Sequence, residues 1–404
     1  MGRTYIYLDT AAATPVDGRV LAAMRPYLAR DFGNPSSIHD SGVKARRAVE
    51  TARAGIASIL GAQADELIFT SGGTEANNLA ILGIIGHRVS QGHSVSGAQI
   101  ITSTIEHASV LEPCRALERQ GLTLTCLPVR NDGLVDPAEL KRALRPETIL
   151  VSIAYANNEI GVIQPLREIT RVVRKFRNVK HRVSHMVCDT RCCTPIFHTD
   201  ACQAPRFLDL DVRHLGVDLM TLNSAKIYGP KGAGCLYVRR GVDLSPLVYG
   251  GGQERGYRSG TENVVGIVGF SAALELGVKL REKESVRLSK LRDYFVARLL
   301  KLEGVFLNGS PTARLPNNVN VSFAGTDSEF VVLNLDAEGV AVSSGSACST
   351  HLKDSSYVIE ALGGGRERAL AAVRFSFGRD TTKHDLDYVL KILPGILSRA
   401  RVGL

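Results

Sequence analysis

The feature that most constrains the fold is an alternation of helical and strand-like stretches from residue 40 to about residue 270. Such alternation is typical of strands that lie side by side in a sheet and are connected by helices covering it. We therefore expect an α/β architecture with a mainly parallel sheet. Residues 41–60 show the helical part of the pattern, and Gly61 follows them as a residue that commonly ends helices.

Short apolar segments between the helical stretches have the length and composition of buried strands. They are residues 66–70, 99–102, 123–127, 148–153 and 234–238. Residues 272–302 then have the amphipathic spacing of a long helix, after which the pattern changes to that of a smaller α+β unit. We expect a large domain over residues 14–273 and a small domain formed by residues 1–13 and 274–404.

The composition excludes several classes of protein. With 44% hydrophobic and 22% charged residues, the chain of 404 residues resembles ordinary globular proteins, which excludes disorder and collagen-like structure. Its apolar stretches are too short to span a membrane. Because 49 basic residues are interspersed with 40 acidic ones and the aromatic content is 6%, we expect no direct nucleic-acid binding despite the net charge of +9.

The N-terminus lacks the apolar core and cleavage site of a secretory signal, so we expect a cytoplasmic protein whose eight cysteines are mostly thiols. Cys188, Cys192 and Cys193 lie near histidines, but no second cysteine pair completes a zinc pattern, and we expect no metal. Apart from Cys348, the remaining cysteines are expected to pack near strands or helices: Cys114, Cys126, Cys202 and Cys235.

Residues 69–78 place a strand, a glycine-containing turn and the start of a helix in immediate succession. Backbone N–H groups and the positive end of the helix dipole meet at such a junction and favour an anion such as phosphate, to which the Thr74 hydroxyl would add a donor. The Walker pattern is absent, and residues 250–256 do not match the dinucleotide-binding pattern. ATP and NAD are therefore poor candidates.

Two further segments end in residues that suit one cofactor. Asp200 follows an apolar approach that begins at Phe197, and Lys226 follows another that begins at Leu219. Pyridoxal 5'-phosphate requires a carboxylate at its pyridine nitrogen, an amine that binds its aldehyde covalently and a site for its phosphate. The order of phosphate site, Asp200 and Lys226 favours this cofactor. Taken singly, each residue is also compatible with a capping or solvated role.

A series of motifs resembles the cysteine desulfurase family, in particular its housekeeping and nitrogen-fixation branch. The matching segments are 9–15, 32–37, 71–75, 106–107, 157–161, 198–200, 226–232, 258–261 and 343–348. The resemblance extends from residue 5 to about residue 390. It implies a fold-type I, class V aminotransferase-like homodimer that uses pyridoxal 5'-phosphate, transfers sulfur from L-cysteine to its own cysteine as a persulfide, and releases L-alanine.

The resemblance also implies roles for individual residues. Lys226 would bind the cofactor covalently, Asp200 would pair with its pyridine nitrogen, and His107 would stack on its ring. Further cofactor contacts would come from Asn158 and Gln203 at the ring oxygen, from Gly73, Thr74, Asn223, Ser224 and Ala225 at the phosphate, and from Thr261 of the partner subunit.

Cys348 is the predicted nucleophile. It lies in a polar stretch rich in serine and glycine that is typical of a loop, and a loop would let its thiol reach both a buried cofactor and an external acceptor. The resemblance further implies that Arg374 binds the substrate carboxylate, with help from Asn34, and that Lys226 and His107 transfer protons. The sulfur acceptor would be an iron–sulfur scaffold protein or a tRNA-thiolation enzyme.

Three features depart from the family pattern. Residues 223–225 read Asn-Ser-Ala where the family has Ser-Gly-His, so Ala225 replaces an imidazole beside the phosphate. An insertion between residues 176 and 197 adds the cysteine cluster, and the tail with which housekeeping relatives dock their scaffold protein is expected to be missing. Two alternatives therefore stay open: a selenocysteine lyase, and a non-catalytic sulfur-relay scaffold of the same fold that has lost the cofactor.

Overall fold

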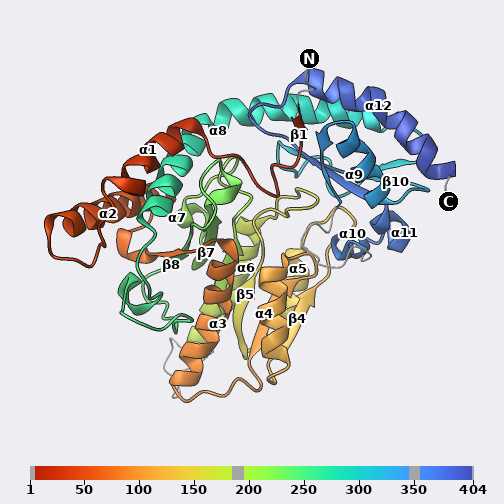
Figure 1. The fold of residues 1–404 in the computed structure, drawn as a ribbon. Coiled ribbons are helices and arrows are strands. Elements are labelled where there is room, and N and C mark those ends of the chain that lie inside the picture. The colour runs from red at the N-terminus through yellow and green to blue at the C-terminus, as the bar shows by residue number, and fades with distance from the viewer. Residues whose placement is uncertain (1–4, 184–194, 345–354, 403–404) are drawn as a thin grey trace.

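A computed structural model of the chain describes residues 5–183, 195–344 and 355–402. Cys348 and the cluster of Cys188, Cys192 and Cys193 lie outside the described residues. Figure 1 shows the two larger β-sheets, which differ in size, with a long helix, α8 (Val264–Leu299), running past both. Within the described ranges, no helix is long and apolar enough to cross a membrane.

The larger sheet contains seven strands among the described residues, in the order β2-β8-β7-β6-β5-β3-β4. Their bounds are β2 (Leu67–Thr70), β3 (Gln99–Ser103), β4 (Thr123–Leu127), β5 (Thr148–Ser152), β6 (Ile196–Asp200), β7 (Leu219–Asn223) and β8 (Gly234–Val238). β8 pairs antiparallel with both of its neighbours, whereas the pairs from β7 to β4 are parallel. The expected mainly parallel sheet is confirmed, and the five expected strands agree to within one residue at each end.

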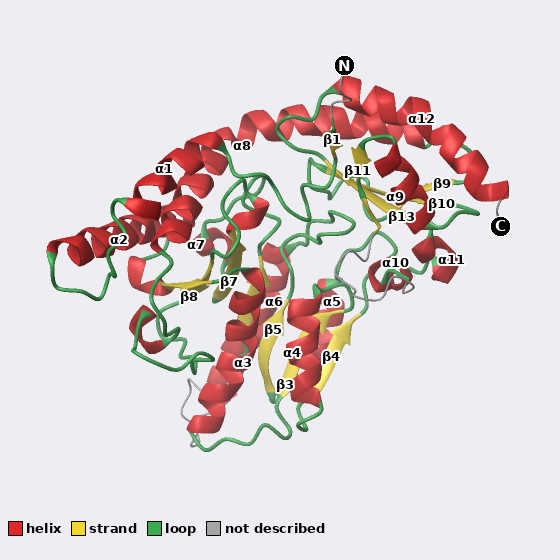
Figure 2. Cartoon of the chain, viewed as in Figure 1, coloured by secondary structure: helices red, strands yellow, loops and turns green. Residues whose placement is uncertain are grey.

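Helices cover both faces of this sheet (Figure 2). Along β2, Leu67 and Phe69 belong to a core cluster shared with α2 (Asp40–Leu60) and α8, whereas Ile68 between them packs with α3 (Gly73–Ser90). Burial on both faces explains why the strands are continuously apolar in sequence. The other helices of this part are α1 (Gly18–Ala29), α4 (Ala108–Glu118), α5 (Pro137–Ala143), α6 (Leu166–Val183) and α7 (Val212–Leu215).

The smaller sheet has the order β12-β13-β10-β9, and its neighbouring strands pair antiparallel. A short strand from the N-terminal segment, β1 (Ile6–Tyr7), pairs with β11 (Val340–Ala341) beside it. The remaining elements of this part are β9 (Val305–Leu307), β10 (Asn318–Phe323), α9 (Ser328–Ala337), β12 (Ser343–Ser344), α10 (Tyr357–Ala361), α11 (Gly365–Leu370), β13 (Ala372–Ser376) and α12 (Lys383–Val402).

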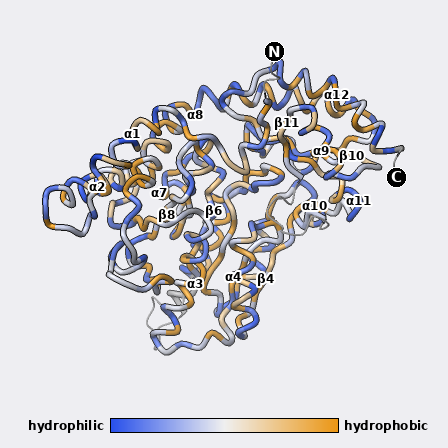
Figure 3. Tube along the Cα trace, viewed as in Figure 1, coloured by the Kyte–Doolittle hydropathy of each residue, from blue (hydrophilic) through white to orange (hydrophobic). Residues whose placement is uncertain are grey.

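Helix α8 contributes to both hydrophobic cores. Phe270 and Leu274 pack into the core of the larger sheet, while Leu288 and Phe295 pack into the core of the smaller one. Figure 3 shows apolar residues gathered along the inner elements and polar ones more often along the outer loops. The domains 14–273 and 1–13 plus 274–404 remain a prediction, and α8 continues across their boundary.

The expectation that this helix begins at residue 272 was wrong, because α8 begins at Val264. Its first two turns have no polar face, and their glycines allow close packing against α1. A Cβ at Gly269 would lie 2.6 Å from the sulfur of Met24. Amphipathic spacing therefore could not detect this part of the helix.

Polar contacts of Glu159 join the two parts of the chain. Asn318 and Asn320 on β10 donate hydrogen bonds to the Glu159 carbonyl oxygen at 3.1 and 3.2 Å, and the Ser356 hydroxyl donates to its carboxyl group at 2.6 Å. Burial raises the pKa of Glu159 to about 7, against the opposing effects of Ser356 and the Arg374 charge. This carboxyl group therefore keeps its proton to a higher pH than it would in water.

We predict that ionisation of Glu159 lowers the free energy of unfolding as the pH rises. The unfolded carboxyl ionises from its ordinary value of 4.5, whereas the folded group stays protonated to about pH 7. The stabilisation is present below the lower pH and is lost between the two, by up to about 1.4 kcal/mol per pH unit in the free energy of unfolding. Glu159→Gln keeps an acceptor for Ser356 but does not ionise, so it should flatten this slope in chemical denaturation at several pH values.

The exposed Glu118→Gln variant is the matched control and should keep the wild-type slope. An unchanged slope in Glu159→Gln would show that this carboxyl ionises normally in the folded state.

Candidate active site

A cavity of about 810 Å³ opens at the carboxyl ends of the parallel strands. Ligands of open α/β sheets bind at this edge of the sheet. The residues predicted from the sequence that line the cavity are Gly73, Thr74, His107, Asn158, Asp200, Gln203, Asn223, Lys226 and Arg374. Asn34, Ser224, Ala225 and Thr261 are not among its lining residues, and Cys348 lies outside the described part of the chain.

The start of α3 forms one end of the cavity. Gly72 precedes it with φ +149°, a value that residues with side chains rarely adopt, and a Cβ at Gly73 would lie 2.6 Å from the sulfur of Cys202. The first N–H groups of a helix have no partner within the helix and favour an anion. Asn223 adds a donor, because its Oδ1 accepts the Ala225 N–H at 3.1 Å and its Nδ2 is left for another contact.

Ser224 and Ala225, which follow Asn223, do not line the cavity. Ser224 is fully buried, and its hydroxyl has no hydrogen-bond partner among the described residues. The carbonyl oxygen of Ala225 accepts hydrogen bonds from the N–H and the hydroxyl of Thr14, both at 3.0 Å. Of residues 223–225, Asn223 alone lines the cavity, so phosphate contacts by the other two remain predictions without support from this geometry.

Thr261 was predicted to bind the cofactor of the partner subunit, and Asn34 was predicted to help bind the substrate carboxylate. Both residues are exposed in the single chain. The Asn34 Oδ1 accepts the Ser36 N–H at 2.9 Å, which stabilises the local turn. Neither residue contributes to the cavity of one chain, and their roles remain predictions.

Asp200 ends the central strand β6 and lies in the wall of the cavity. One carboxylate oxygen accepts a hydrogen bond from Asn77 Nδ2 at 2.7 Å, and the other accepts the Cys202 N–H at 2.9 Å. The two donors fix the orientation of the carboxylate. An anionic acceptor is thereby held in place for a cationic or N–H group of a ligand.

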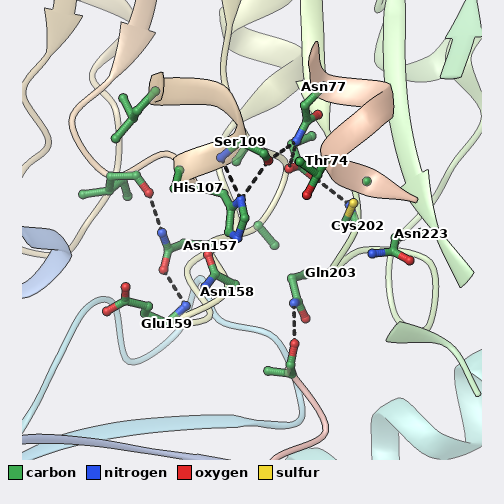
Figure 4. Close-up of a pocket in the computed structure, with 18 of the residues that line it drawn as sticks. Thr74, Asn77, His107, Ser109, Asn157, Asn158, Glu159, Cys202, Gln203 and Asn223 are labelled. Atoms are coloured by element: carbon green, nitrogen blue, oxygen red, sulfur yellow. Dashed lines mark hydrogen bonds between the residues drawn. The ribbon is translucent and has the colours of Figure 1, made fainter. Parts of the chain in front are cut away.

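Lys226 lies at the end of a short 3₁₀ turn, Ser224–Lys226, directly after β7. Its Nζ donates a hydrogen bond to the carbonyl oxygen of Ala12, which itself lines the cavity. The Gln203 side chain donates to the neighbouring carbonyl of Ala11 at 3.0 Å (Figure 4). The N-terminal segment thus closes the cavity on the side of the amine.

His107 is the N-cap residue of α4, and its Nδ1 accepts the Ser109 N–H at 3.0 Å. The Ser109 hydroxyl also lies 2.8 Å from Nδ1 (Figure 4). In the same view the imidazole lies on the side of the cavity where Asn158 and Gln203 are found. The start of the helix therefore determines which ring nitrogen of His107 faces the protein.

Asn158 is held by a turn that its neighbour stabilises. The Asn157 Oδ1 accepts the N–H groups of Glu159 and Ile160 at 2.8 and 2.9 Å, and its Nδ2 donates to the Ile105 carbonyl at 2.7 Å. Arg374 on β13 then donates to the Asn158 carbonyl oxygen at 3.0 Å. Residues far apart in the chain thereby form one wall.

Arg374 is buried, with 3% of its side chain exposed, and pairs with Asp9 at 2.6 Å. Its two terminal nitrogens bind Asp9 and Asn158, whereas its Nε has no hydrogen-bond partner among the described residues. A buried guanidinium nitrogen without a partner is unusual in a protein. Because Arg374 lines the cavity, its guanidinium is a candidate group for a ligand carboxylate.

Sequence reasoning assigned no role to three residues that line the cavity, namely Asn77, Ser109 and Asn157, nor to Glu106 next to His107. Asn77 lies one turn after Gly73 on α3, so helix spacing was a usable signal for it, whereas no such spacing indicates Ser109. Burial raises the pKa of Glu106 to about 7, even though Ser103 and the Ala154 N–H donate hydrogen bonds to its carboxyl group.

One expectation about the cysteines was wrong, that for Cys126. Cys202 is buried as expected, and it also lines the cavity, where burial raises the pKa of its thiol well above the ordinary value. Cys126 is exposed, because β4 is the edge strand of the larger sheet. Cys114 and Cys235 are buried as expected.

The sequence predicted that the cluster of Cys188, Cys192 and Cys193 binds no metal. This cluster lies outside the described residues. Within the described ranges, no group of three or more histidine, cysteine, aspartate or glutamate side chains could hold a metal ion.

Comparisons with known proteins agree with the resemblance found in the sequence. Residues 6–389 match the aminotransferase class-V family. The chain is 47% identical over 397 residues to the cysteine desulfurase IscS of Dictyoglomus turgidum, which covers 98% of this chain and 95% of that protein. It is 44% identical over 396 residues to the cysteine desulfurase IscS of Methanosarcina thermophila, covering 98% of this chain and 93% of that protein.

Solved structures give the same answer. A NifS-like protein is similar with a TM-score of 0.88 and 34% sequence identity, over 98% of this chain and 100% of that one. The structure of SspA in complex with cysteine is similar with a TM-score of 0.76 and 34% identity, over 93% of this chain and 99% of that one. The expected fold-type I architecture is confirmed, and the chain belongs to the aminotransferase class-V family and, within it, to the cysteine desulfurases.

Proposed function

We propose that the cavity is the active site in which this cysteine desulfurase takes sulfur from L-cysteine with the help of bound pyridoxal 5'-phosphate. The observation that carries the proposal is the meeting of three unlike groups in one cavity. These are the helix start at Gly73, the fixed carboxylate of Asp200 and the amine of Lys226.

The residues present fit this cofactor. The N–H groups at the start of α3 and the amide of Asn223 suit its phosphate, the carboxylate of Asp200 suits its protonated pyridine nitrogen, and Lys226 suits its aldehyde. Ala225 removes an imidazole donor from the phosphate site, but Asn223 supplies a donor in the same turn. When bound, pyridoxal phosphate supplies a ring that stabilises negative charge at the substrate Cα.

The protein groups then bind and orient the substrate. Arg374, which lines the cavity, offers its guanidinium to the carboxylate of an amino acid, while Asp9 and Asn158 hold the guanidinium in position. Lys226 can transfer a proton at the substrate Cα, because an amine at that place is a suitable general base. A substrate as small as L-cysteine can thus be held at its carboxylate and attacked at its sulfur.

Cys348 is the proposed nucleophile. Ser343 pairs in register with Arg374, and Ser355 and Tyr357 line the cavity, so the described residues on both sides of Cys348 belong to the site. The Cys348 thiolate would bond to the substrate sulfur while the bond from that sulfur to Cβ breaks. The enzyme would then carry a persulfide and release L-alanine after proton uptake at carbon.

We also propose a homodimer in which Thr261 of the partner subunit reaches the phosphate. Exposed large apolar side chains, such as Phe32, Ile38 and Tyr249, support an interface. The acceptor of the persulfide sulfur is proposed to be an iron–sulfur scaffold or a tRNA-thiolation enzyme. A cytoplasmic location would keep Cys348 reduced.

We predict that Lys226→Ala loses the visible absorbance band that pyridoxal phosphate gives when a lysine binds it, together with sulfide release from cysteine. The amine is the group that binds the cofactor aldehyde. The exposed Lys231→Ala variant is the control and should keep both the band and the activity. A wild-type protein that stays colourless after addition of pyridoxal phosphate would instead favour the non-catalytic sulfur-relay alternative.

Replacement of Arg374 should weaken binding of the substrate carboxylate. A hydrogen bond to a charged group is worth about 1.5–3 kcal/mol, so Arg374→Gln should lower kcat/KM for L-cysteine by roughly 10- to 100-fold, mainly through KM. Steady-state kinetics at saturating cofactor test this. The exposed Arg366→Gln variant should behave like the wild type, and an unaltered KM in Arg374→Gln would rule out this contact.

For Cys348→Ser we expect loss of alanine release from L-cysteine, since the hydroxyl does not accept sulfur as a thiolate does. Release of alanine from selenocysteine, measured in parallel, distinguishes the desulfurase from a selenocysteine lyase. A loss confined to cysteine indicates the persulfide route. The exposed Cys126→Ser variant serves as control, and an active Cys348→Ser enzyme would remove Cys348 from the mechanism.

A further inference from the structure

A chain of hydrogen bonds connects Asp200 with His107 through two residues of unassigned role. Asn77 Nδ2 lies 2.7 Å from an Asp200 carboxylate oxygen and 2.8 Å from the Ser109 hydroxyl, which in turn lies 2.8 Å from His107 Nδ1. Figure 4 shows Asn77, Ser109 and His107 next to one another along one wall of the cavity. Asn77 and Ser109 are both buried, with 1% and 8% of their surface exposed.

The direction of each hydrogen bond follows from the chemistry of the groups. The Asp200 carboxylate is an acceptor, so the Asn77 amide must present its nitrogen, and that NH₂ group has two hydrogens for Asp200 and Ser109. The Asn77 Oδ1 is buried and has no hydrogen-bond partner among the described residues. The Asn77 amide therefore uses both hydrogens of its nitrogen for Asp200 and Ser109, while its oxygen has no partner among the described residues.

The remaining bonds are fixed in the same way. The Ser109 hydroxyl accepts from Asn77, so its own hydrogen is available for His107 Nδ1. The Ser109 backbone N–H donates to the same nitrogen at 3.0 Å. His107 Nδ1 therefore meets two donors, and a neutral imidazole so placed carries its hydrogen on Nε2.

Capping of α4 alone does not account for this arrangement. A helix cap explains the bond from the Ser109 N–H to His107. It explains neither the hydroxyl on the same nitrogen nor the buried amide that joins this hydroxyl to Asp200. The additional bonds concern the imidazole and the carboxylate, both of which line the cavity.

We infer that Asn77 and Ser109 are positioning residues that keep His107 in its Nε2–H form and align it with Asp200. His107 then presents a hydrogen-bond donor to the contents of the cavity, rather than an acceptor. The inference rests on the proposed function only for the identity of those contents, because the hydrogen bonds belong to the protein itself.

The test is the tautomer of His107, read from ¹⁵N-labelled histidines by NMR in the full-length protein at a pH where the ring is neutral. The spectrum is recorded with pyridoxal phosphate bound and again after its removal, and His107→Gln assigns the signal. We expect Nε2–H in the wild type. Ser109→Ala should lower the ratio of Nε2–H to Nδ1–H by about two- to tenfold, which is the value of one neutral hydrogen bond.

Asn77→Ala separates the two ends of the chain of bonds. It removes a donor from the Asp200 carboxylate, so the Kd for pyridoxal phosphate should rise by about tenfold or more, whereas Ser109→Ala should leave that Kd nearly unchanged. Cofactor titration monitored by absorbance gives this value without any activity assay.

Ser152→Ala is the matched control, since it removes a buried hydroxyl that lies 2.8 Å from Nδ1 of another histidine, His198. It should alter the His198 signals and leave those of His107 as in the wild type. An Nδ1–H tautomer in the wild type, or an identical tautomer ratio in Ser109→Ala, would overturn the inference. If the wild-type protein shows the expected tautomer of His107 but no desulfurase activity, that result would count against the proposed function alone.

Discussion

The parallel pairing of β5, β6 and β7 is the constraint on which the site depends. Parallel strands end at the same edge of the sheet, so Asp200 at the end of β6 and Lys226 just after β7 come within one cavity although 26 residues separate them in sequence. The strands are buried on both faces, which leaves this edge as the place where polar side chains can gather. The candidate site therefore lies at the carboxyl ends of the parallel strands, at the edge of the buried core.

The smaller sheet completes the cavity at an electrostatic cost. Arg374 on β13 is buried beside Asp9, and Glu159 is buried within reach of its charge. Glu106 is buried elsewhere in the wall, and burial raises the pKa of both carboxyl groups to about 7. Burial of an ionisable group is unfavourable unless the group is paired or neutral. Arg374 is paired, and the two carboxyl groups are held in an environment that favours their neutral form. Of these buried groups, the charged one is therefore Arg374, which is expected to meet a ligand.

The sequence predicted the architecture well where a strand is apolar throughout and buried along its whole length. Residues 234–238 coincide with β8 for this reason. The start of α8 was missed, because its first turns lack a polar face. In the site, Asp200 and Lys226 could be recognised by their position at strand ends, whereas the contacts of Asn77 and Ser109 arise only when α3 and α4 lie side by side. Long-range packing of that kind leaves no periodic signal in one sequence.

The departure at residues 223–225 illustrates how local structure limits what a substitution changes. Asn223 ends a strand and Lys226 ends the following 3₁₀ turn, so the residues between them rotate away from the cavity: Ser224 is buried and the carbonyl of Ala225 binds Thr14. The backbone of this turn is therefore anchored by contacts that do not require a histidine side chain. Replacing the imidazole with a methyl group removes one potential donor to an anion, while the turn and the lysine at its end keep their position. Because the amide of Asn223 lies beside the start of α3, the anion-binding end of the cavity retains both a helix terminus and a side-chain donor.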